Sequence, residues 1–231
     1  MNKGILISFT ESNNDFDKEL REWFVHEHIN ERALYTPGFF RARIYKSIFK
    51  SPKYFATYET RKITDLSSKE YIDKVGNQSS WSKKVIPKLT ILDRLTAEIT
   101  FSESSGFGGI VSTYRFFPPM ELNKRNKLRE SLIKEIFPTY IKNHKIIGLI
   151  LAENIPKITN ITGDKARLIG GSPSKANNIE WIIIIEGHSK KSMIELCDNI
   201  YNFNKFQWLN LADQGRLNLY SLIFGNYKLN N

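Results

Sequence analysis

Hydrophobic positions in the first hundred residues alternate between the period of a strand and the period of a helix. Phe16, Leu20, Trp23 and Phe24 fall on one stripe at about 100° per residue, which predicts an amphipathic helix at 15–30. Short β-rich runs bounded by turn residues predict strands on both sides of this helix. In order, we expect a strand at 5–10, this helix, strands at 39–45 and 54–60, a second helix opening at 65–70, and a strand at 91–101.

The second half of the chain repeats this order. Leu128, Leu132, Ile136 and Tyr140 form the apolar stripe of a helix at 123–143. The two middle strands are separated by a polar stretch, 154–178, which we expect to be a long loop that is either a functional lid or simply mobile. The elements expected around it are strands at 110–117, 146–151, 179–186 and 217–224, and a helix at 189–203.

The order of elements predicts an α+β fold made of two tandem ferredoxin-like βαββαβ repeats. The first repeat covers 1–101, a small-residue linker covers 102–108, and the second repeat, with the long loop 154–178, covers 109–231. Each sheet has helices on one face only, so its other face needs a cover. A second copy supplies that cover, and we therefore expect an intramolecular pseudo-dimer resembling a dimeric α/β-barrel, with a cavity between the sheets.

Composition narrows the class of protein. Of 231 residues, 41% are hydrophobic and 13% aromatic, which excludes a disordered or fibrous chain. The single cysteine, Cys197, excludes an internal disulfide and a multi-cysteine metal site. No apolar run approaches the roughly 18 residues that a membrane span requires, and the first residues do not form a secretion signal. We expect a soluble, cytoplasmic protein without a membrane partner.

The positive charge is spread along the chain. Of the net charge of +10, +4 lies in 1–102 and +6 beyond it. A nucleic-acid-binding protein usually concentrates basic residues on one stripe or tail, so the spread argues against a nucleic-acid partner. It is compatible with a weak general attraction for anionic ligands.

Ionisable residues lie at the end of the first predicted helix. Glu27 and Glu31 continue its apolar stripe, and His28 lies at the edge of the stripe. A buried carboxylate is costly unless it is paired, and burial raises its pKa toward the range of acid–base catalysis. The structural alternative is that the helix ends near Asn30 and the glutamates pair with nearby arginines.

The strand at 39–45 alternates cleanly, which places Phe40, Ala42 and Ile44 on the helix-covered face. Arg41, Arg43 and Tyr45 then share the opposite face with Phe39, where they could hold an anionic or carbonyl-bearing ligand. At a sheet edge they would only be solvated. Two further candidate ligand contacts are Trp23 on the helix and Tyr58 on the next strand.

Four sequence segments carry a family resemblance. They are WFVHEHINER at 23–32, PGFFRARIY at 37–45, KYFATYE at 53–59 and LSSKEY at 66–71. Together they resemble the dimeric α/β-barrel superfamily, most of all its EthD-like and related uncharacterised members. The resemblance covers 1–101, and Asn30 stands where those members often have proline. It implies a ferredoxin-like fold with a ligand cleft between helix and sheet.

The resemblance leaves several functions open, because this superfamily includes cofactor-free isomerases, cyclases and monooxygenases as well as haem enzymes. Our leading hypothesis is a small-molecule enzyme or binding protein without cofactor, performing lyase, isomerase or cyclase chemistry. His28 would be the general base, oriented by Glu27 or Glu31, with Arg41, Arg43 and Tyr45 holding the substrate.

The alternatives come from different classes of protein. A haem protein would need His144 or His188 as axial ligand, although neither lies in a haem motif, and we expect no metal site. An RNA-binding protein of the RRM type has the same element order, but 54–59 lacks the glycine-bearing RNP1 pattern. A non-catalytic protein and a homodimer both stay open.

Overall fold

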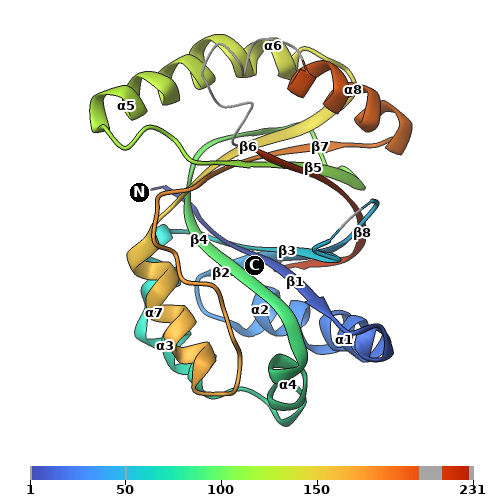
Figure 1. The fold of residues 1–231 in the computed structure, drawn as a ribbon, viewed down its shortest axis with the longest axis vertical. Helices are drawn as coiled ribbons and strands as arrows, with labels where there is room; N and C mark the ends of the chain where they lie inside the picture. Colours follow the sequence, from blue (N-terminus) through green and yellow to red (C-terminus); the bar gives the residue numbers. More distant parts are fainter. Residues whose placement is uncertain (1, 50, 203–214, 229–231) are drawn as a thin grey trace. The chain divides into compact units, whose positions relative to one another are not determined.

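The computed structural model describes residues 2–49, 51–202 and 215–228, of which 199–202 are described by backbone alone. The chain forms two compact units. The first unit comprises Met1–Glu98, Asn154–Asn177 and Leu222–Asn231, and the second comprises Ile99–Glu153 and Asn178–Ser221. Both contain strands and helices, so the predicted α+β class is confirmed (Figure 1).

The first unit is an antiparallel sheet with helices packed on one face (Figure 1). Its strands lie in the order β4-β1-β3-β2, the strand order of a ferredoxin-like βαββαβ unit. The elements are β1 (Gly4–Ser12), α1 (Asp17–Trp23), a π-helical turn (Phe24–His28), α2 (Ile29–Tyr35), β2 (Phe39–Ser47), β3 (Tyr54–Thr60), α3 (Lys69–Gly76), α4 (Ser80–Val85) and β4 (Leu89–Ser104).

The second unit repeats this plan. Its strands lie in the equivalent order β6-β7-β5-β8, also antiparallel. The elements that lie wholly or partly in this unit are β5 (Ile110–Phe116), α5 (Leu122–Ser131), a π-helical turn (Leu132–Ile136), α6 (Phe137–Ile141), β6 (Ile146–Asn154), β7 (Trp181–Gly187), α8 (Lys190–Asn202) and β8 (Arg216–Tyr227), of which β8 belongs to the first unit from Leu222 on. The predicted helix at 189–203 ends at Phe203, which lies outside the described residues.

Buried side chains hold the first sheet against its helices. In β3 all seven residues are buried, with Tyr54, Ala56 and Tyr58 in the hydrophobic core beneath the helices. On β2 the expected alternation is wrong at its start, because a bulge between Phe39 and Arg41 shifts the register. Phe39, and not Phe40, therefore joins the helix-covered core.

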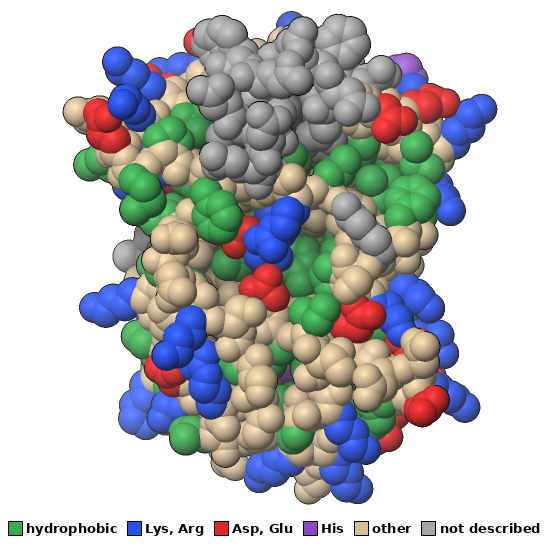
Figure 2. Space-filling view, viewed as in Figure 1, with side chains coloured by type: hydrophobic (Ala, Val, Ile, Leu, Met, Phe, Trp, Pro, Cys, Tyr) green, Lys and Arg blue, Asp and Glu red, His purple; other side chains and the backbone are tan. Residues whose placement is uncertain are grey.

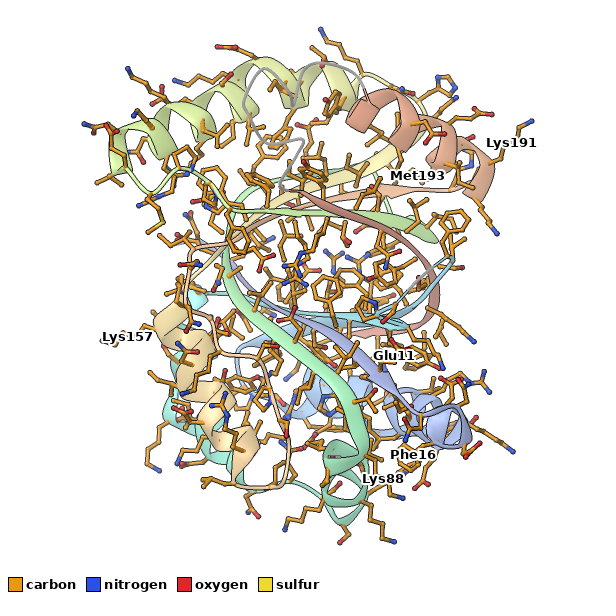
Figure 3. All side chains as sticks on the ribbon, viewed as in Figure 1. Glu11, Phe16, Lys88, Lys157, Lys191 and Met193 are labelled. Atoms are coloured by element: carbon orange, nitrogen blue, oxygen red, sulfur yellow. The ribbon has the colours of Figure 1, made fainter. Side chains whose placement is uncertain are left out.

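Individual side-chain contacts also hold the helices in place. Figure 3 shows Phe16 and Lys88 beside each other at the end of the first unit, with the Lys88 ammonium 4.3 Å from the centre of the Phe16 ring. In the second unit the Met193 side chain of α8 is fully buried and packs where a Cβ on Gly187 would otherwise lie. Close packing of this kind fixes each helix against its sheet.

The stretch 154–178 differs from the expected loop, because it contains helix α7 (Pro156–Arg167). Although it lies between β6 and β7 in the sequence, it packs with the first unit, next to α3. The backbone N–H of Thr96 in β4 donates to Thr159 Oγ1 at 2.8 Å, and the N–H of Ile155 donates to the Thr96 carbonyl at 2.8 Å. The long insertion thus completes the first unit.

The surface agrees with the charge distribution expected from the sequence. On the face shown in Figure 2, Lys and Arg side chains are dispersed and interleaved with Asp and Glu. None of the described helices is long and apolar enough to cross a membrane.

Candidate functional site

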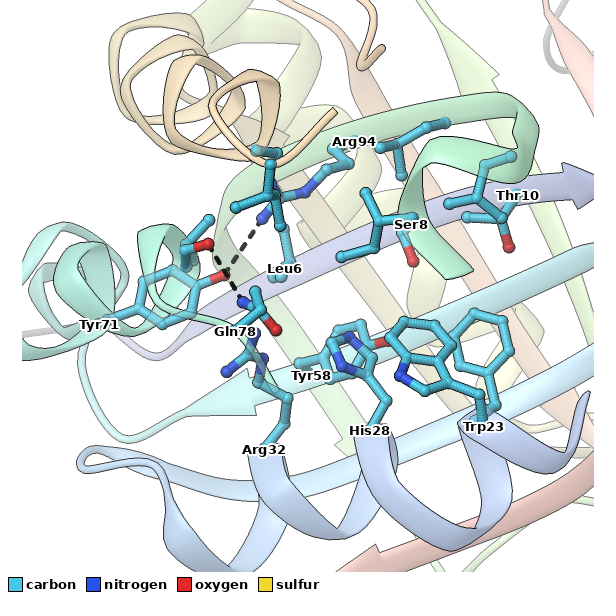
Figure 4. A pocket seen from close by; sticks show the side chains of 17 residues that line it. Leu6, Ser8, Thr10, Trp23, His28, Arg32, Tyr58, Tyr71, Gln78 and Arg94 are labelled. Carbon is cyan, nitrogen blue, oxygen red and sulfur yellow. Dashed lines mark hydrogen bonds between the residues drawn. The ribbon is translucent and has the colours of Figure 1, made fainter. Parts of the chain in front are cut away.

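A cavity of about 60 Å³ lies within the first unit, between its helices and its sheet (Figure 4). Its walls come from β1, β3, β4, α3 and the insertion that contains α7, together with the helical segment formed by α1, the π-helical turn and α2. The lining residues are Leu6, Ser8, Thr10, Trp23, Phe24, His28, Arg32, Tyr58, Tyr71, Val75, Gln78, Ile86, Leu89, Leu92, Arg94, Ala166 and Ile169.

The π-helical turn determines which helix residues face this cavity. In a regular α-helix the residue one turn beyond Trp23 is Glu27, whereas a π turn makes it His28. The Trp23 and His28 rings are accordingly stacked, with centroids 4.2 Å apart. From His28 the α-helix resumes, and Arg32 follows one turn later. Trp23, His28 and Arg32 therefore line the cavity together (Figure 4).

His28 is enclosed by aromatic rings and cations. Its side chain is 13% exposed, and the rings of Phe24 and Tyr58 meet it edge-on at 6.0 and 5.5 Å. Burial, followed by the positive charges of Arg32, Arg94 and Lys74, lowers the pKa of His28 well below its ordinary value. His28 is therefore neutral at neutral pH, and one ring nitrogen has a lone pair that can accept a proton.

Two arginines line the cavity beside His28. Arg32 is 3% exposed and Arg94 is 9% exposed. Arg94 donates to the Tyr71 hydroxyl at 3.2 Å (Figure 4). It also donates to the Thr162 carbonyl of α7 at 3.3 Å. The Arg32 guanidinium lies 5.7 Å from the centre of the Tyr71 ring.

Several polar atoms of the cavity have no hydrogen-bond partner among the described residues. They are Thr10 Oγ1, His28 Nδ1, Arg32 Nη1 and Gln78 Oε1. Gln78 uses its amide nitrogen on two backbone carbonyls, at 3.0 and 3.2 Å, which leaves its oxygen available. Unsatisfied buried polar groups are costly in a folded protein and often indicate a ligand or ordered water. The cavity thus offers donors and acceptors to a guest molecule.

Of the predicted acid–base residues, His28 lines the cavity and Glu27 does not. Glu27 Oε1 accepts hydrogen bonds from Ser79 Oγ at 2.6 Å, Ser82 Oγ at 3.0 Å and Trp23 Nε1 at 3.1 Å. Ser79 also caps α4 through the Ser82 N–H. Glu27 therefore connects the first helix to the start of α4.

Glu31 lies near His28 without forming a hydrogen bond to it. Its carboxylate is 3.9 Å from His28 Nδ1, 3.5 Å from Arg32 Nη1 and 3.3 Å from Lys74 Nζ. The first distance is too long for a hydrogen bond. Glu31 mainly balances part of the positive charge of Arg32 and Lys74.

The predicted ligand-holding residues of β2 lie away from the His28 cavity. Arg41, Arg43 and Tyr45 alternate with the core residues Ala42 and Ile44 and do not line it. Arg41 forms a two-pronged ion pair with Glu59 of β3, at 2.8 and 2.7 Å, and Arg43 Nη2 approaches the same carboxylate at 3.4 Å. By contrast, Trp23 and Tyr58, the other two predicted ligand contacts, line the cavity.

Sequence reasoning did not identify Arg94, Tyr71 or Gln78 as site residues, and it considered Arg32 only as a partner of glutamate. Arg32 carries a weak signal, because it follows His28 at the i+4 spacing of a helix face. Arg94 is the one basic residue of β4, at the start of an alternation with Thr96. Neither signal shows which elements meet across the cavity.

The haem alternative is not supported by the positions of its histidines. His144 and His188 are both exposed, and neither lines the cavity. Among the described residues, no group of three or more His, Cys, Asp or Glu side chains is arranged to hold a metal ion. Neither of these two histidines could therefore serve as the axial ligand of a haem in this cavity.

The second unit has the same π turn but different chemistry. The last residue of its turn is Ile136, in the position of His28, and Tyr140 follows where the first unit has Arg32. Burial raises the pKa of Tyr140 to about 12, so its hydroxyl stays neutral. The imidazole of His28 in the first unit therefore has no counterpart at this position.

No protein-family model and no curated protein matches the sequence. Solved structures do match. An anthrone oxidase-like protein superimposes with a TM-score of 0.64 at 10% identity, over 98% of this chain and 93% of that one. A Lactobacillus acidophilus protein assigned as a monooxygenase gives 0.60 at 7% identity, over 98% and 97%.

A mutant chlorite dismutase from Candidatus Nitrospira defluvii, in complex with cyanide, gives a TM-score of 0.57 at 8% identity, over 96% of this chain and 91% of that one. These descriptions name different reactions, so the likeness carries the fold and no single activity. The chain therefore shares the ferredoxin-like fold of these solved structures, which is the fold that the sequence resemblance implied.

Proposed function

We propose that the chain binds a small molecule in the cavity of the first unit and that His28 accepts a proton from it without a cofactor. The observation that carries this proposal is a buried, neutral histidine whose Nδ1 has no hydrogen-bond partner among the described residues. A base must be unprotonated at the working pH and within reach of its proton donor. His28 meets the first condition, and its place in the cavity wall meets the second.

The reaction class follows from the same groups. Removal of a proton next to a carbonyl produces an enolate, and nearby cations stabilise its negative charge. Arg32 and Arg94 line the cavity beside His28 and can serve in this way. Isomerase, lyase and cyclase reactions at an acidic C–H all begin with this step.

Proton transfer can be tested before the natural substrate is known. β-Keto acids, 2-oxo acids and aryl ketones are incubated with the protein in D₂O, and loss of the acidic C–H signal is followed by NMR. We expect catalysed exchange for at least one class, reduced about 100-fold or more in His28→Gln. His26→Gln is the matched control, because His26 lies two residues away and is exposed.

Two results would contradict the proposal. One is exchange in His28→Gln that equals the wild-type rate while the melting temperature is unchanged, which would make His28 structural. The other is absence of catalysed exchange for all three classes.

We also propose that the two units form the intramolecular pseudo-dimer predicted from the sequence. The equivalent strand orders support this, as does the burial of both faces of β3 and β5. A crystal structure in which the two sheets share no face-to-face contact would contradict it.

A further inference from the structure

The charges around the cavity do not balance. Arg32, Arg94 and Lys74 bring three positive charges, and His28 is neutral. Glu31 is the carboxylate placed among them, at 3.5 Å from Arg32 and 3.3 Å from Lys74. The two hydrogen bonds of Arg94 go to a hydroxyl and a backbone carbonyl, both uncharged. The cavity therefore has an excess of positive charge.

Excess charge is costly at this depth. Arg32 and Arg94 are each more than nine-tenths buried, and a buried positive charge is costly where neutral partners or a shared carboxylate replace its hydration only in part. Arg32 Nη1 lacks a hydrogen-bond acceptor among the described residues. Tyr71 accepts from Arg94, which leaves its own O–H free to donate. Two donors in the cavity wall, Arg32 Nη1 and the Tyr71 O–H, can thus serve one acceptor, and the Arg94 guanidinium adds its positive charge beside them.

From these contacts we infer that the ligand is a carboxylate, held by Arg32, Arg94 and the Tyr71 hydroxyl. Planar guanidinium groups match carboxylate oxygens in geometry as well as in charge. The cavity volume of about 60 Å³ limits the part of the ligand that is enclosed to a few heavy atoms. The inference rests on the proposed function, because it names the substrate class of the same cavity.

In this arrangement the residue that binds the carboxylate, Arg32, is distinct from the residue that accepts the proton, His28. Arg32 and His28 are four residues apart on a helix, which corresponds to a rise of about 6 Å. A carboxylate at Arg32 therefore places the next part of the ligand beside His28. The bound negative charge would offset the field of the arginines and raise the pKa of His28, making it a stronger base once the ligand is present. Glu31 and Lys74 are the other charged groups near this histidine.

The test compares anionic ligands with neutral ligands of the same shape. Acetate, lactate and benzoate are each titrated into the full chain by calorimetry at pH 7, beside their amides. We expect at least one carboxylate to bind at least tenfold more tightly than its amide. Arg94→Gln should weaken that carboxylate about tenfold or more, while Arg61→Gln, which removes one exposed charge of the same unit, should change it less than twofold.

The outcomes separate this inference from the proposed function. Carboxylate binding that persists in His28→Gln, together with no proton exchange in the wild type, would support the carboxylate site and contradict the role of His28 as a base. Equal affinity for each carboxylate and its amide, or no binding of any of the three carboxylates, would overturn the inference of a carboxylate site. The comparison uses the wild-type protein, so it decides the matter even if Arg94→Gln does not fold. A sulfate titration that matches the best carboxylate would show a general anion site and also overturn it.

Discussion

At the scale of single residues, burial fixes the protonation state of His28. Its pKa is lowered in the folded protein, whereas the unfolded chain titrates near 6.5. Below that pH the unfolded state binds a proton that the folded state does not, so acidification destabilises the fold. From pH 7 to 5 we expect the free energy of unfolding to fall more steeply in the wild type than in His28→Gln.

The measurement is urea unfolding at pH 5, 6 and 7. The contribution of one histidine is at most about 1.4 kcal/mol per pH unit. His26→Gln should keep the wild-type slope. A slope in His28→Gln equal to that of the wild type would show that this imidazole is protonated in the fold.

Glu27 makes a different prediction, because its contacts are structural. Replacing it with Gln removes a charged acceptor shared by three donors and should reduce the free energy of unfolding by about 1–3 kcal/mol. Glu22→Gln is the control, since Glu22 pairs with the exposed His26, and its replacement should change stability by less than about 0.5 kcal/mol. The unfolding slope with pH should stay steep in both variants. A flattened slope in Glu27→Gln would show that Glu27 acts on His28.

The residues that sequence reasoning could find were those whose chemistry is unusual in a local pattern. His28 and Trp23 belong to such a pattern, on one helix. Arg94 and Tyr71 are close only because β4 and α3 meet across the cavity, and local periodicity carries no information on that meeting. The site residues that the sequence did not identify, Arg94 and Tyr71, are therefore ones that only the fold brings together.

At the scale of elements, the π turn is the feature that the sequence did not indicate. A period of 3.6 residues places Glu27 on the stripe of Trp23, and one extra residue in the turn replaces it with His28. Helix α7 was also missed, since threonine, asparagine and glycine in 156–167 are weak helix formers. Its helix is held by contacts with β4 and α3, which only the fold provides.

The segment after α7 is packed so closely that one methyl group should disturb it. A Cβ at Gly171 would lie 2.8 Å from Ile86 Cγ2 and 3.0 Å from the Ala166 carbonyl, and both residues line the cavity. We expect Gly171→Ala to lower stability by about 1–3 kcal/mol, measured by thermal or urea unfolding. A Cβ at Gly109 would meet nothing within 4 Å, so Gly109→Ala is the matched control and should have little effect. Equal stability of the two variants would show that the cavity wall around Gly171 shifts to accept the added methyl group without loss of stability.

At the scale of the whole molecule, the fold class followed from element order alone. Six alternating elements in each half predict a ferredoxin-like unit, and both units have the expected strand order. The division into units was harder to foresee, because Asn154–Asn177 belongs to the first unit although it lies in the second half of the sequence. Nothing in a polar stretch indicates the distant surface that it will cover.

This exchange of a segment between the halves of the sequence can be tested by excision. Replacing 157–174 with a Gly-Ser linker removes the Thr162 carbonyl from Arg94, the Thr159 hydroxyl from Thr96, and the cavity wall formed by Ala166 and Ile169. We expect the β4 amides around Thr96 to exchange faster with deuterium and any carboxylate binding to be lost, because Arg94 then becomes accessible to water. Amides of β5 and β7, in the second unit, should keep their protection.

Replacing the exposed 102–105 with Gly and Ser is the control and should change neither property. Unchanged protection at Thr96 after excision would show that α7 is dispensable to the first unit, and retained carboxylate binding would show that the anion is held without this wall.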